Sequence, residues 1–359
     1  MRDERGVTRE ITLLVDYKGH FGTKHGAVPY RSGLSREKLA RHFQERRIQA
    51  RFQNFSEVDF RDLRIRDRCF LYSSAEDHDL HYRSFIEDVV LGLETCGAWV
   101  VPAHRFLRAH HNKVFMEILR DQMGAVAARG LTARSYGTRE ELEKDLEAVA
   151  LPAVVKPAAG SMGRDVVLCR SREELHRAAS RVSASRHWPT DAWDFGRSLR
   201  RRGYVRESRH RRKFVVQTFL PGLENDWKIL VYGRKYYILL RRTRTNDFRA
   251  SGSGRFEFTS QVPEGLLDFA ASIFAELDVP HVSLDIGVDA ARFHLFEFQA
   301  VHFGTTTVEE APFHFVRGKE GWEKVDGRSQ VEEEFVRSVV DYLERKEPER
   351  RAQRAALPS

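Results

Sequence analysis

Strand-like and helix-like segments alternate along the first 105 residues, and this alternation limits the folds open to the chain more than any other feature. Residues 11–17, ITLLVDY, form an apolar run typical of a buried strand, and residues 35–48 have helical spacing after a Ser35 cap. Further strands are expected at residues 50–55, 68–74 and 98–104, with a helix at residues 82–97. Strands alternating with helices predict an α/β domain with a largely parallel sheet.

The second half of the chain has more paired strands. We expect strands at residues 213–222, 226–244 (two strands joined around Gly233), 281–289 and 293–303. Helices are expected at residues 112–123, 139–150, 171–182, 265–278 and 330–346. The polar residues 347–359 predict a disordered tail.

Residues 154–163, VVKPAAGSMG, combine a strand, a lysine and a loop of small side chains. Such a loop lets backbone N–H groups approach a polyanion closely, so a phosphate is the natural ligand. The lysine precedes the glycines, which distinguishes the segment from the P-loop and dinucleotide fingerprints. An ordinary hairpin turn is the alternative, since residues 166–168 can form a return strand.

The composition is that of a globular protein, since the chain has 359 residues of which 41% are hydrophobic. No apolar run approaches the roughly 18 residues that span a bilayer, and residues 1–10 have no signal-peptide segment. The cysteines, Cys69, Cys96 and Cys169, lack metal-site spacing and are expected to be buried thiols. We therefore expect a cytoplasmic protein without a membrane span.

Two predicted strands contain acidic residues within an apolar alternation: Asp285 in SLDIGVD and Glu297 in FEFQAVHF. Gln299 lies two residues after Glu297 and shares its face of the strand. Two carboxylates and an amide oxygen suit Mg²⁺ whose other ligands are phosphate oxygens. Alternatively, the acidic residues are ion-paired or hydrogen-bonded residues of the sheet.

Arginines close the strand before this pair, at Arg241, Arg242 and Arg244, and Arg249 follows. Guanidinium groups bind phosphate and carboxylate oxygens through planar forks. A basic edge strand that discourages aggregation is the alternative. The chain also has a formal net charge of +8, which favours anionic partners.

In this order, the segments HNK, VVKPAAGSMG, QTFLPG, DWKILVYGRKYY, RRTRTNDFRASGSG, SLDIGVD and FEFQAVHFGT resemble the ATP-grasp superfamily over residues 110–310. The resemblance is to its carboxylate–amine ligases, with a glutathione synthetase-like ATP-binding fold. It implies a parallel α/β pre-ATP-grasp domain followed by a two-lobed α+β ATP-grasp fold. The implied division is residues 1–108 for the first domain, 109–220 for the N-lobe, 221–346 for the C-lobe and 347–359 for the tail.

The resemblance also implies a role for each matching residue. The expected ATP-binding residues are Lys113, Lys156, Gly160, Ser161, Met162, Gly163, Gln217, Thr218, Phe219, Leu220 and Asp226. The expected catalytic residues are Lys228, Arg242 and Arg249. The expected ligands of Mg²⁺, or of Mn²⁺, are Asp285, Glu297 and Gln299.

The activity that the resemblance implies is transfer of the ATP γ-phosphoryl group to a carboxylate, followed by attack of an amine on the acyl phosphate. Substrates would be small-molecule or peptide carboxylates and amines, including acidic or glycan-linked ones, and a homodimer is common in the family. A kinase, a thiol ligase, and a non-catalytic nucleotide-sensing or nucleic-acid-binding module are the alternatives. Nucleic acid is not the expected partner, because the arginines are not interleaved with stacking aromatics.

The insert at residues 180–213 combines many arginines with Trp188, Trp193 and Phe195. We hypothesise that it folds over the active site and recruits an acidic or carboxylate-bearing acceptor. The alternative is a disordered basic loop.

Overall fold

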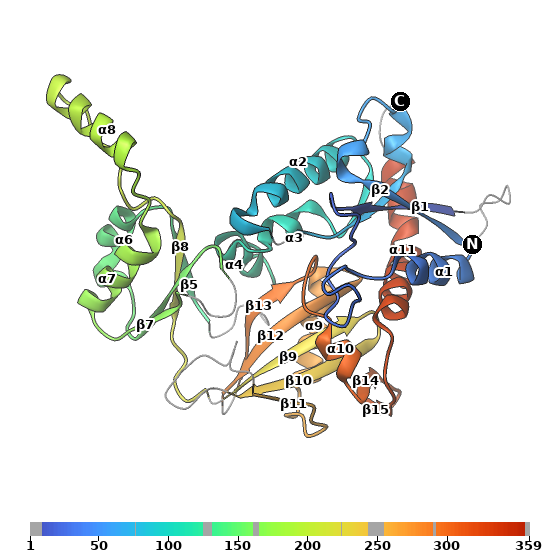
Figure 1. Ribbon diagram of the computed structural model, residues 1–359. Helices are drawn as coiled ribbons and strands as arrows, with labels where there is room; N and C mark the ends of the chain where they lie inside the picture. Colours follow the sequence, from blue (N-terminus) through green and yellow to red (C-terminus); the bar gives the residue numbers. More distant parts are fainter. Residues whose placement is uncertain are drawn as a thin grey trace.

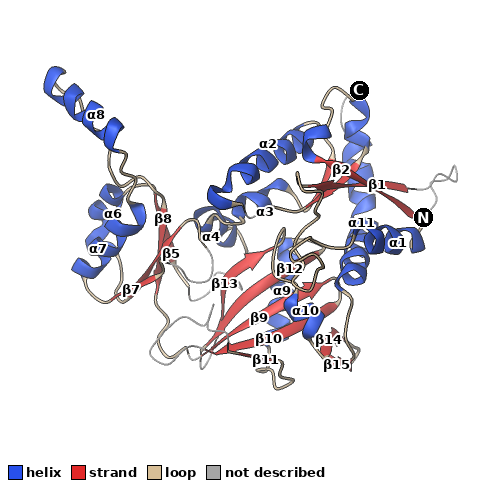
Figure 2. Ribbon diagram, in the orientation of Figure 1, coloured by secondary structure: helices blue, strands red, loops and turns tan. Residues whose placement is uncertain are grey.

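The computed structural model describes residues 9–75, 77–124, 131–160, 165–223, 225–242, 255–289 and 292–355. Within them, three sheets follow one another along the chain, and helices pack against each sheet (Figures 1 and 2). The first sheet is parallel and the other two are antiparallel. This confirms the predicted fold class, a parallel α/β domain followed by a two-lobed α+β unit.

The N-terminal domain has a parallel sheet in the order β2-β1-β3-β4. Its elements are β1 (Arg9–Val15), α1 (Arg36–Glu45), β2 (Ile48–Asn54), β3 (Cys69–Tyr72), α2 (His81–Thr95), β4 (Trp99–Val101) and α3 (His104–Ala109), with short 3-10 helices at Phe55–Glu57, Leu63–Asp67 and His78–Leu80. Ser35 caps α1 as expected, since its side chain accepts a hydrogen bond from the Lys38 backbone. β1 lies between β2 and β3, so Leu13 and Leu14 are buried on opposite faces.

The second lobe has an antiparallel sheet in the order β5-β8-β6-β7. Its elements are α4 (Lys113–Asp121), β5 (Ala133–Tyr136), α6 (Arg139–Asp145), a 3-10 helix at Leu146–Ala148, β6 (Ala153–Pro157), β7 (Val167–Cys169), α7 (Arg172–Ser183), α8 (Trp188–Arg200) and β8 (Phe214–Thr218). Val155, Leu175 and Phe214 are fully buried in its core.

The third lobe contains the largest sheet, in the order β13-β12-β9-β10-β14-β15, with β11 paired to β10. Its elements are β9 (Asn225–Tyr232), β10 (Lys235–Arg242), β11 (Phe256–Glu257), α9 (Leu266–Leu277), β12 (His281–Val288), β13 (Phe293–Gln299), α10 (Thr306–Glu310), β14 (Phe313–Arg317) and β15 (Trp322–Asp326). Helix α9 covers one face of it through Leu266, Ala270 and Ile273.

The C-terminal helix α11 (Val331–Ala355) joins the third lobe to the N-terminal domain. Its residues Val336 and Leu343 share one buried cluster with Phe43 of α1 and Tyr237 of β10. The helix continues to Ala355, although the sequence predicted a disordered tail from residue 347. Contacts to the first domain explain the difference: the Glu347 carboxylate pairs with Arg9, and the Arg350 side chain donates to the Gly97 carbonyl.

The cysteines are free, with Cys69 and Cys169 buried as expected and Cys96 half-buried. In the described residues, no helix is long and apolar enough to cross a membrane.

The cluster around α11 leads to a prediction about stability. Leu343 has no exposed surface, so Leu343→Ala should leave a cavity and lower the free energy of unfolding by about 3 kcal/mol. Glu344→Ala, at the next and exposed position, should change it by less than about 0.5 kcal/mol. Urea unfolding of both variants tests this, and equal effects would contradict the role assigned to α11.

Candidate functional site

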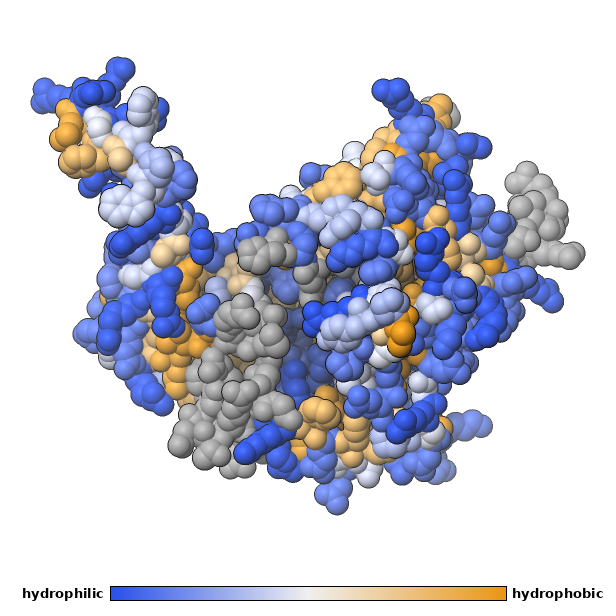
Figure 3. Space-filling view, viewed as in Figure 1, coloured by the Kyte–Doolittle hydropathy of each residue, from blue (hydrophilic) through white to orange (hydrophobic). Residues whose placement is uncertain are grey.

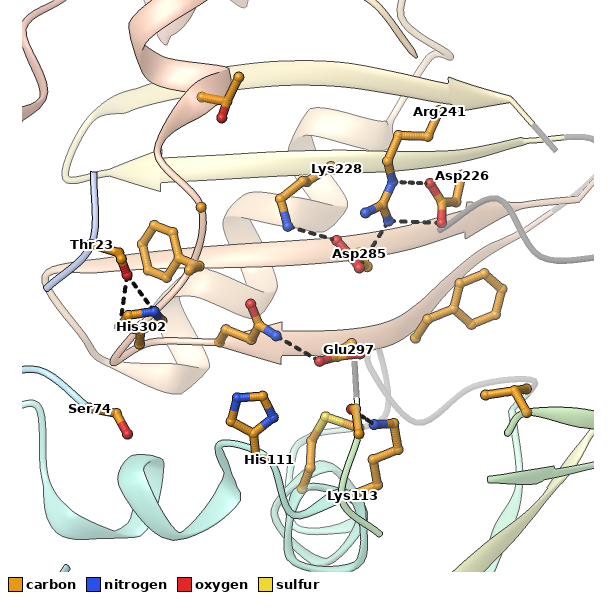
Figure 4. A pocket seen from close by; sticks show the side chains of 18 of the residues that line it. Thr23, Ser74, His111, Lys113, Asp226, Lys228, Arg241, Asp285, Glu297 and His302 are labelled. Atoms are coloured by element: carbon orange, nitrogen blue, oxygen red, sulfur yellow. Dashed lines mark hydrogen bonds and ion pairs between the residues drawn. The ribbon is translucent and has the colours of Figure 1, made fainter. Parts of the chain in front are cut away.

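A cleft of about 860 Å³ lies where the three lobes meet. Strands β6 and β8 line one end, the β9, β10, β12 and β13 sheet forms its floor, and the loop at residues 16–31 of the N-terminal domain lines the other end (Figure 4). The volume and the mixture of apolar and charged lining are typical of a small-molecule site. Most of the residues predicted from the motifs are brought together here.

Lys156 lies at the end of β6 and points into the cleft beside Gln217 of β8. The Nζ atom of Lys156 donates to Oε1 of Gln217 at 2.5 Å. Antiparallel pairing of Val154 with Gln217 sets this contact, because Lys156 and Val154 share one face of the strand. Gln217 is 3% exposed, so its orientation is set by packing as well as by hydrogen bonding.

Glu117 of α4 completes the chain of contacts, and sequence reasoning missed it. The Gln217 amide nitrogen donates to Glu117 Oε1 at 3.2 Å, and Glu117 is ion-paired with Arg120. Burial raises the pKa of Glu117 despite the opposing charge of Arg120. The connected set Arg120, Glu117, Gln217 and Lys156 therefore positions the lysine from behind.

Burial lowers the pKa of Lys156 to about 8, although the Glu117 carboxylate partly opposes this. Lys113 provides a second cation, and its Nζ atom donates to the Gly160 carbonyl at 2.8 Å. Its backbone N–H also donates to the Ala158 carbonyl, which ties α4 to the start of the glycine loop. Ser161, Met162 and Gly163 lie outside the described residues.

Residues 218–220 connect β8 to the third lobe and line the cleft. The backbone N–H groups of Thr218 and Phe219 already donate to the carbonyls of Thr132 and Pro152. Among these three expected ATP-binding residues, Leu220 is the one whose backbone N–H has no backbone partner among the described residues. Leu220 is therefore the best candidate of the three to donate a backbone hydrogen bond to the nucleotide.

Four charged side chains, which we call the floor network, lie on the sheet beneath the cleft: Asp226, Lys228, Arg241 and Asp285 (Figure 4). Arg241 binds Asp226 through two hydrogen bonds of 2.6 and 2.8 Å. It also pairs with Asp285 at 2.9 Å, and Lys228 pairs with the other Asp285 oxygen at 3.4 Å. The strand register explains the cluster, because Asp226 faces Arg241 and Lys228 faces Asp285 on adjacent strands.

The two carboxylates of the floor network have opposite pKa shifts. Burial raises the pKa of Asp226, and the nearby Asp285 charge adds to this against the attraction of Arg241. For Asp285, burial is outweighed by Arg241 and Lys228, so its pKa is lowered. Asp285 therefore remains ionised at neutral pH and is able to bind cations.

Glu297 lies opposite Asp285 on β13, and Gln299 follows it on the same face. The Gln299 amide donates to Glu297 at 2.8 Å. No cluster of three His, Cys, Asp or Glu side chains suited to a metal occurs in the described residues. The donor set fits Mg²⁺ that is held by one or two carboxylates and takes its remaining ligands from phosphate oxygens. The alternative to a metal site was that the acidic residues are ion-paired in the sheet, and Asp285 is ion-paired there with Arg241.

Arg242, predicted to be catalytic, lies outside the cleft. Its side chain is 57% exposed and pairs with Glu257. Side chains alternate along β10, so Arg241 faces the cleft and Arg242 faces away. The signal was present in the sequence: a two-residue turn pairs Tyr232 with Lys235 and therefore places Arg241 opposite Asp226. Arg249, the other predicted arginine, lies outside the described residues.

Long-range contacts complete the cleft. Thr23 Oγ1 lies 2.6 Å from Nε2 of His302, which joins the N-terminal loop to the segment after β13. Sequence spacing gave no indication of this pair.

The insert at residues 180–213, which the structure describes in full, contributes no residue to the cleft lining. The hypothesis that it folds over the active site is wrong, because its helix α8 extends away from the cleft (Figure 1).

No protein-family model matches the sequence, and no curated protein matches it. Solved structures match its fold. A Chryseobacterium gregarium RiPP-associated ATP-grasp ligase, in complex with ADP and a leader and core peptide, is 11% identical with a TM-score of 0.52, covering 93% of this chain and 97% of that chain. The D-cycloserine synthetase DcsG is 13% identical with a TM-score of 0.51, covering 93% and 99%. The ADP complex of PurK, N5-carboxyaminoimidazole ribonucleotide synthetase, is 11% identical with a TM-score of 0.50, covering 85% and 74%. The chain therefore has the ATP-grasp fold, as the motifs predicted.

The position of Glu117 leads to a prediction about pH. Lys156 is charged below its pKa of about 8, so ATP affinity should fall as the pH rises through that value. Glu117→Gln removes an attraction that raises the Lys156 pKa, so the fall should begin at lower pH. ATP dissociation constants measured across the pH range test this. Asp121→Asn, on the exposed side of α4, is the control, and the same onset in Glu117→Gln as in the native protein would contradict the assignment.

Proposed function

We propose that this protein is an ATP-dependent ligase that activates a carboxylate as an acyl phosphate and couples it to an amine. The observation that carries the proposal is the arrangement of one cleft. Lys113 and Lys156 lie at one end, and the floor network with Glu297 lies beside them. The ATP-grasp fold supports the proposal, since the similar structures named above are ligases or synthetases.

At the nucleotide end, the two lysines bind the phosphates of ATP and the hinge at residues 218–220 binds the adenine. Gln217 holds Lys156 in place, so the ammonium group needs little reorganisation when ATP binds. Asp226 would accept a hydrogen bond from the ribose, and its carboxylate would then bind both the ribose and Arg241. The glycine loop that begins at Gly160 adds backbone contacts.

In the transfer step, a carboxylate oxygen of the acceptor attacks the γ-phosphorus in line, and the bond from that phosphorus to the β,γ-bridging oxygen breaks to release ADP. Arg241 and Lys228 stabilise the charge on the transferred group, because both are cations that the structure places on the cleft floor. The amine then attacks the acyl carbon, inorganic phosphate leaves, and the amine loses a proton. Positioning and charge neutralisation suffice, with no covalent enzyme intermediate.

Glu297, Gln299 and Asp285 would hold Mg²⁺, or Mn²⁺, which supplies neutralisation of the phosphate charges when it is bound. Glu297 is the best placed of the three, since its carboxylate accepts from a neutral amide rather than from a cation. Asp285 balances the Arg241 and Lys228 charges as well.

The acceptor binds at the end of the cleft formed by the N-terminal domain. Lys18 and Arg31 line this end, so it suits a carboxylate-bearing small molecule or peptide. His302 and Thr23 fix the wall between this end and the sheet.

Neighbouring arginines of β10 offer a matched test. Arg241→Lys retains a charge but loses the planar fork, so ATP turnover measured as ADP release should fall by roughly 100-fold. Arg242→Lys, one residue away on the outer face, should stay within about twofold of the native rate. The assay screens amino acids, sugar acids and short peptides as acceptors.

The lysine variants keep the floor network charged, so both should fold, which thermal melting verifies. A large loss in Arg242→Lys with none in Arg241→Lys would overturn the assignment. Absence of ADP release with every carboxylate–amine pair tested would count against the ligase proposal itself.

A further inference from the structure

Helix α8 (Trp188–Arg200) projects from the second lobe, away from the rest of the molecule (Figures 1 and 3). It lies between α7 and β8, and none of its residues is buried. An isolated helix of this length is only marginally stable in water, and helices of folded proteins usually bury an apolar face. Helix α8 has such a face, yet the part of the chain that the structure describes leaves most of it exposed.

The apolar face consists of Trp188, Ala192, Phe195 and Leu199, which we call the α8 stripe. Their spacing of four, three and four residues places them on one side of the helix. Trp188 is 85%, Phe195 49% and Leu199 72% exposed. Trp193 is also exposed but lies on the other side of the helix, where it lines the hollow beside α8, and Val205 of the following loop is 85% exposed. A contiguous exposed patch of this kind marks an interaction site.

Positive charge surrounds the stripe. Residues 184–213 contain ten arginines and lysines but three carboxylates, a net charge of +7 in a chain whose total is +8. All three carboxylates are engaged locally: Asp191 pairs with Arg209, Asp194 accepts from Tyr204, and Glu207 pairs with Arg211.

The remaining arginines are free to meet a partner. Arg200, Arg201 and Arg202, which we call the arginine rim, are exposed, and none has an ion pair within the described residues. Arg197 lies over the Trp193 ring at 5.6 Å, and Arg206 lies over the Phe195 ring at 5.6 Å. These contacts hold guanidinium groups beside the aromatic rings rather than neutralising them. The occupant of this surface is therefore anionic.

We propose that α8 binds the surface of an anionic lipid bilayer, with the stripe in the interface and the arginine rim on the lipid headgroups. Interfacial helices have this composition: Trp, Phe and Leu on one face and basic residues on the other. The chain would lie on the membrane through α8, not cross it. Arginines near an anionic surface add attraction that falls off within a Debye length.

The shape of the surface favours a bilayer over other anionic partners. The stripe is the outer, convex side of a lone helix, and the hollow beside α8 lies on its polar side, lined by Asp191, Asp194 and Glu207. A peptide that docks through apolar anchors needs a groove, which the stripe lacks. RNA-binding aromatics stack bases from a platform or groove, whereas Ala192 and Leu199 occupy half of this stripe. Binding to a flat, deformable bilayer surface needs neither a groove nor a stacking platform.

Vesicle flotation of the full-length protein tests the proposal. The protein should float with vesicles in which about a third of the lipid is phosphatidylglycerol, and far less with phosphatidylcholine alone. Binding should fall at high salt, because the arginines act through screened attraction. Trp188 of the stripe provides a second readout, since its fluorescence should shift to the blue as it enters the interface.

Two variants separate the contributions of the stripe and the rim. Phe195→Ser with Leu199→Ser should abolish the fluorescence shift and most of the flotation. Arg200→Ser with Arg201→Ser and Arg202→Ser should weaken partitioning about 10- to 100-fold. The control is Arg51→Ser with Arg61→Ser and Arg66→Ser, which removes the same charge from exposed positions of the N-terminal domain and should leave flotation unchanged.

The substituted side chains are exposed, so the variants should keep the native melting temperature and ATP affinity, and these measurements establish that the fold is intact. Failure of the native protein to float with anionic vesicles would overturn the proposal and leave the ligase proposal untouched. The proposal would also be overturned if the stripe variant still floated with anionic vesicles but had lost dimerisation, RNA binding or acidic-peptide binding.

Discussion

The arrangement of the cleft depends on a balance of buried charges in the largest sheet. Two carboxylates on neighbouring strands, Asp226 and Asp285, are stabilised because Arg241 lies between them and Lys228 pairs with Asp285. Unpaired carboxylates at this depth would be strongly unfavourable. The same pairing keeps two cations at the place where phosphate oxygens would lie. Structural stability and the proposed chemistry therefore rest on one set of contacts.

The other lobes place complementary groups around this floor. Strands β6 and β8 hold Lys156 against Gln217, and α4 adds Glu117 behind them. Helix α11 packs the N-terminal domain against the sheet, so the proposed acceptor end has a fixed wall. Helix α8 stands apart from all of this, which is why its charge and aromatic side chains call for a partner outside the chain.

Local pattern predicted the fold class, because strand alternation is a short-range property. The site residues were expected from the resemblance to the ATP-grasp superfamily, and most of those expected residues line the cleft. Strand register is harder to predict: the resemblance implies a catalytic role for Arg242, whereas the turn at Gly233 sets a register in which Arg241 faces Asp226. Glu117 could not be predicted, since it lies 100 residues before Gln217 and only tertiary packing brings them together. Likewise, the composition of residues 180–213 indicated a binding role, whereas the direction in which α8 projects is set by the fold.

Calorimetric titration of ATP, with and without Mg²⁺, tests the central claim most directly. The account predicts that the native protein binds ATP more tightly with Mg²⁺, that Lys156→Ala loses binding, and that Glu297→Ala binds but no longer responds to Mg²⁺. Absence of ATP binding in the native protein, or undiminished binding in Lys156→Ala, would contradict the assignment of this cleft as a nucleotide site.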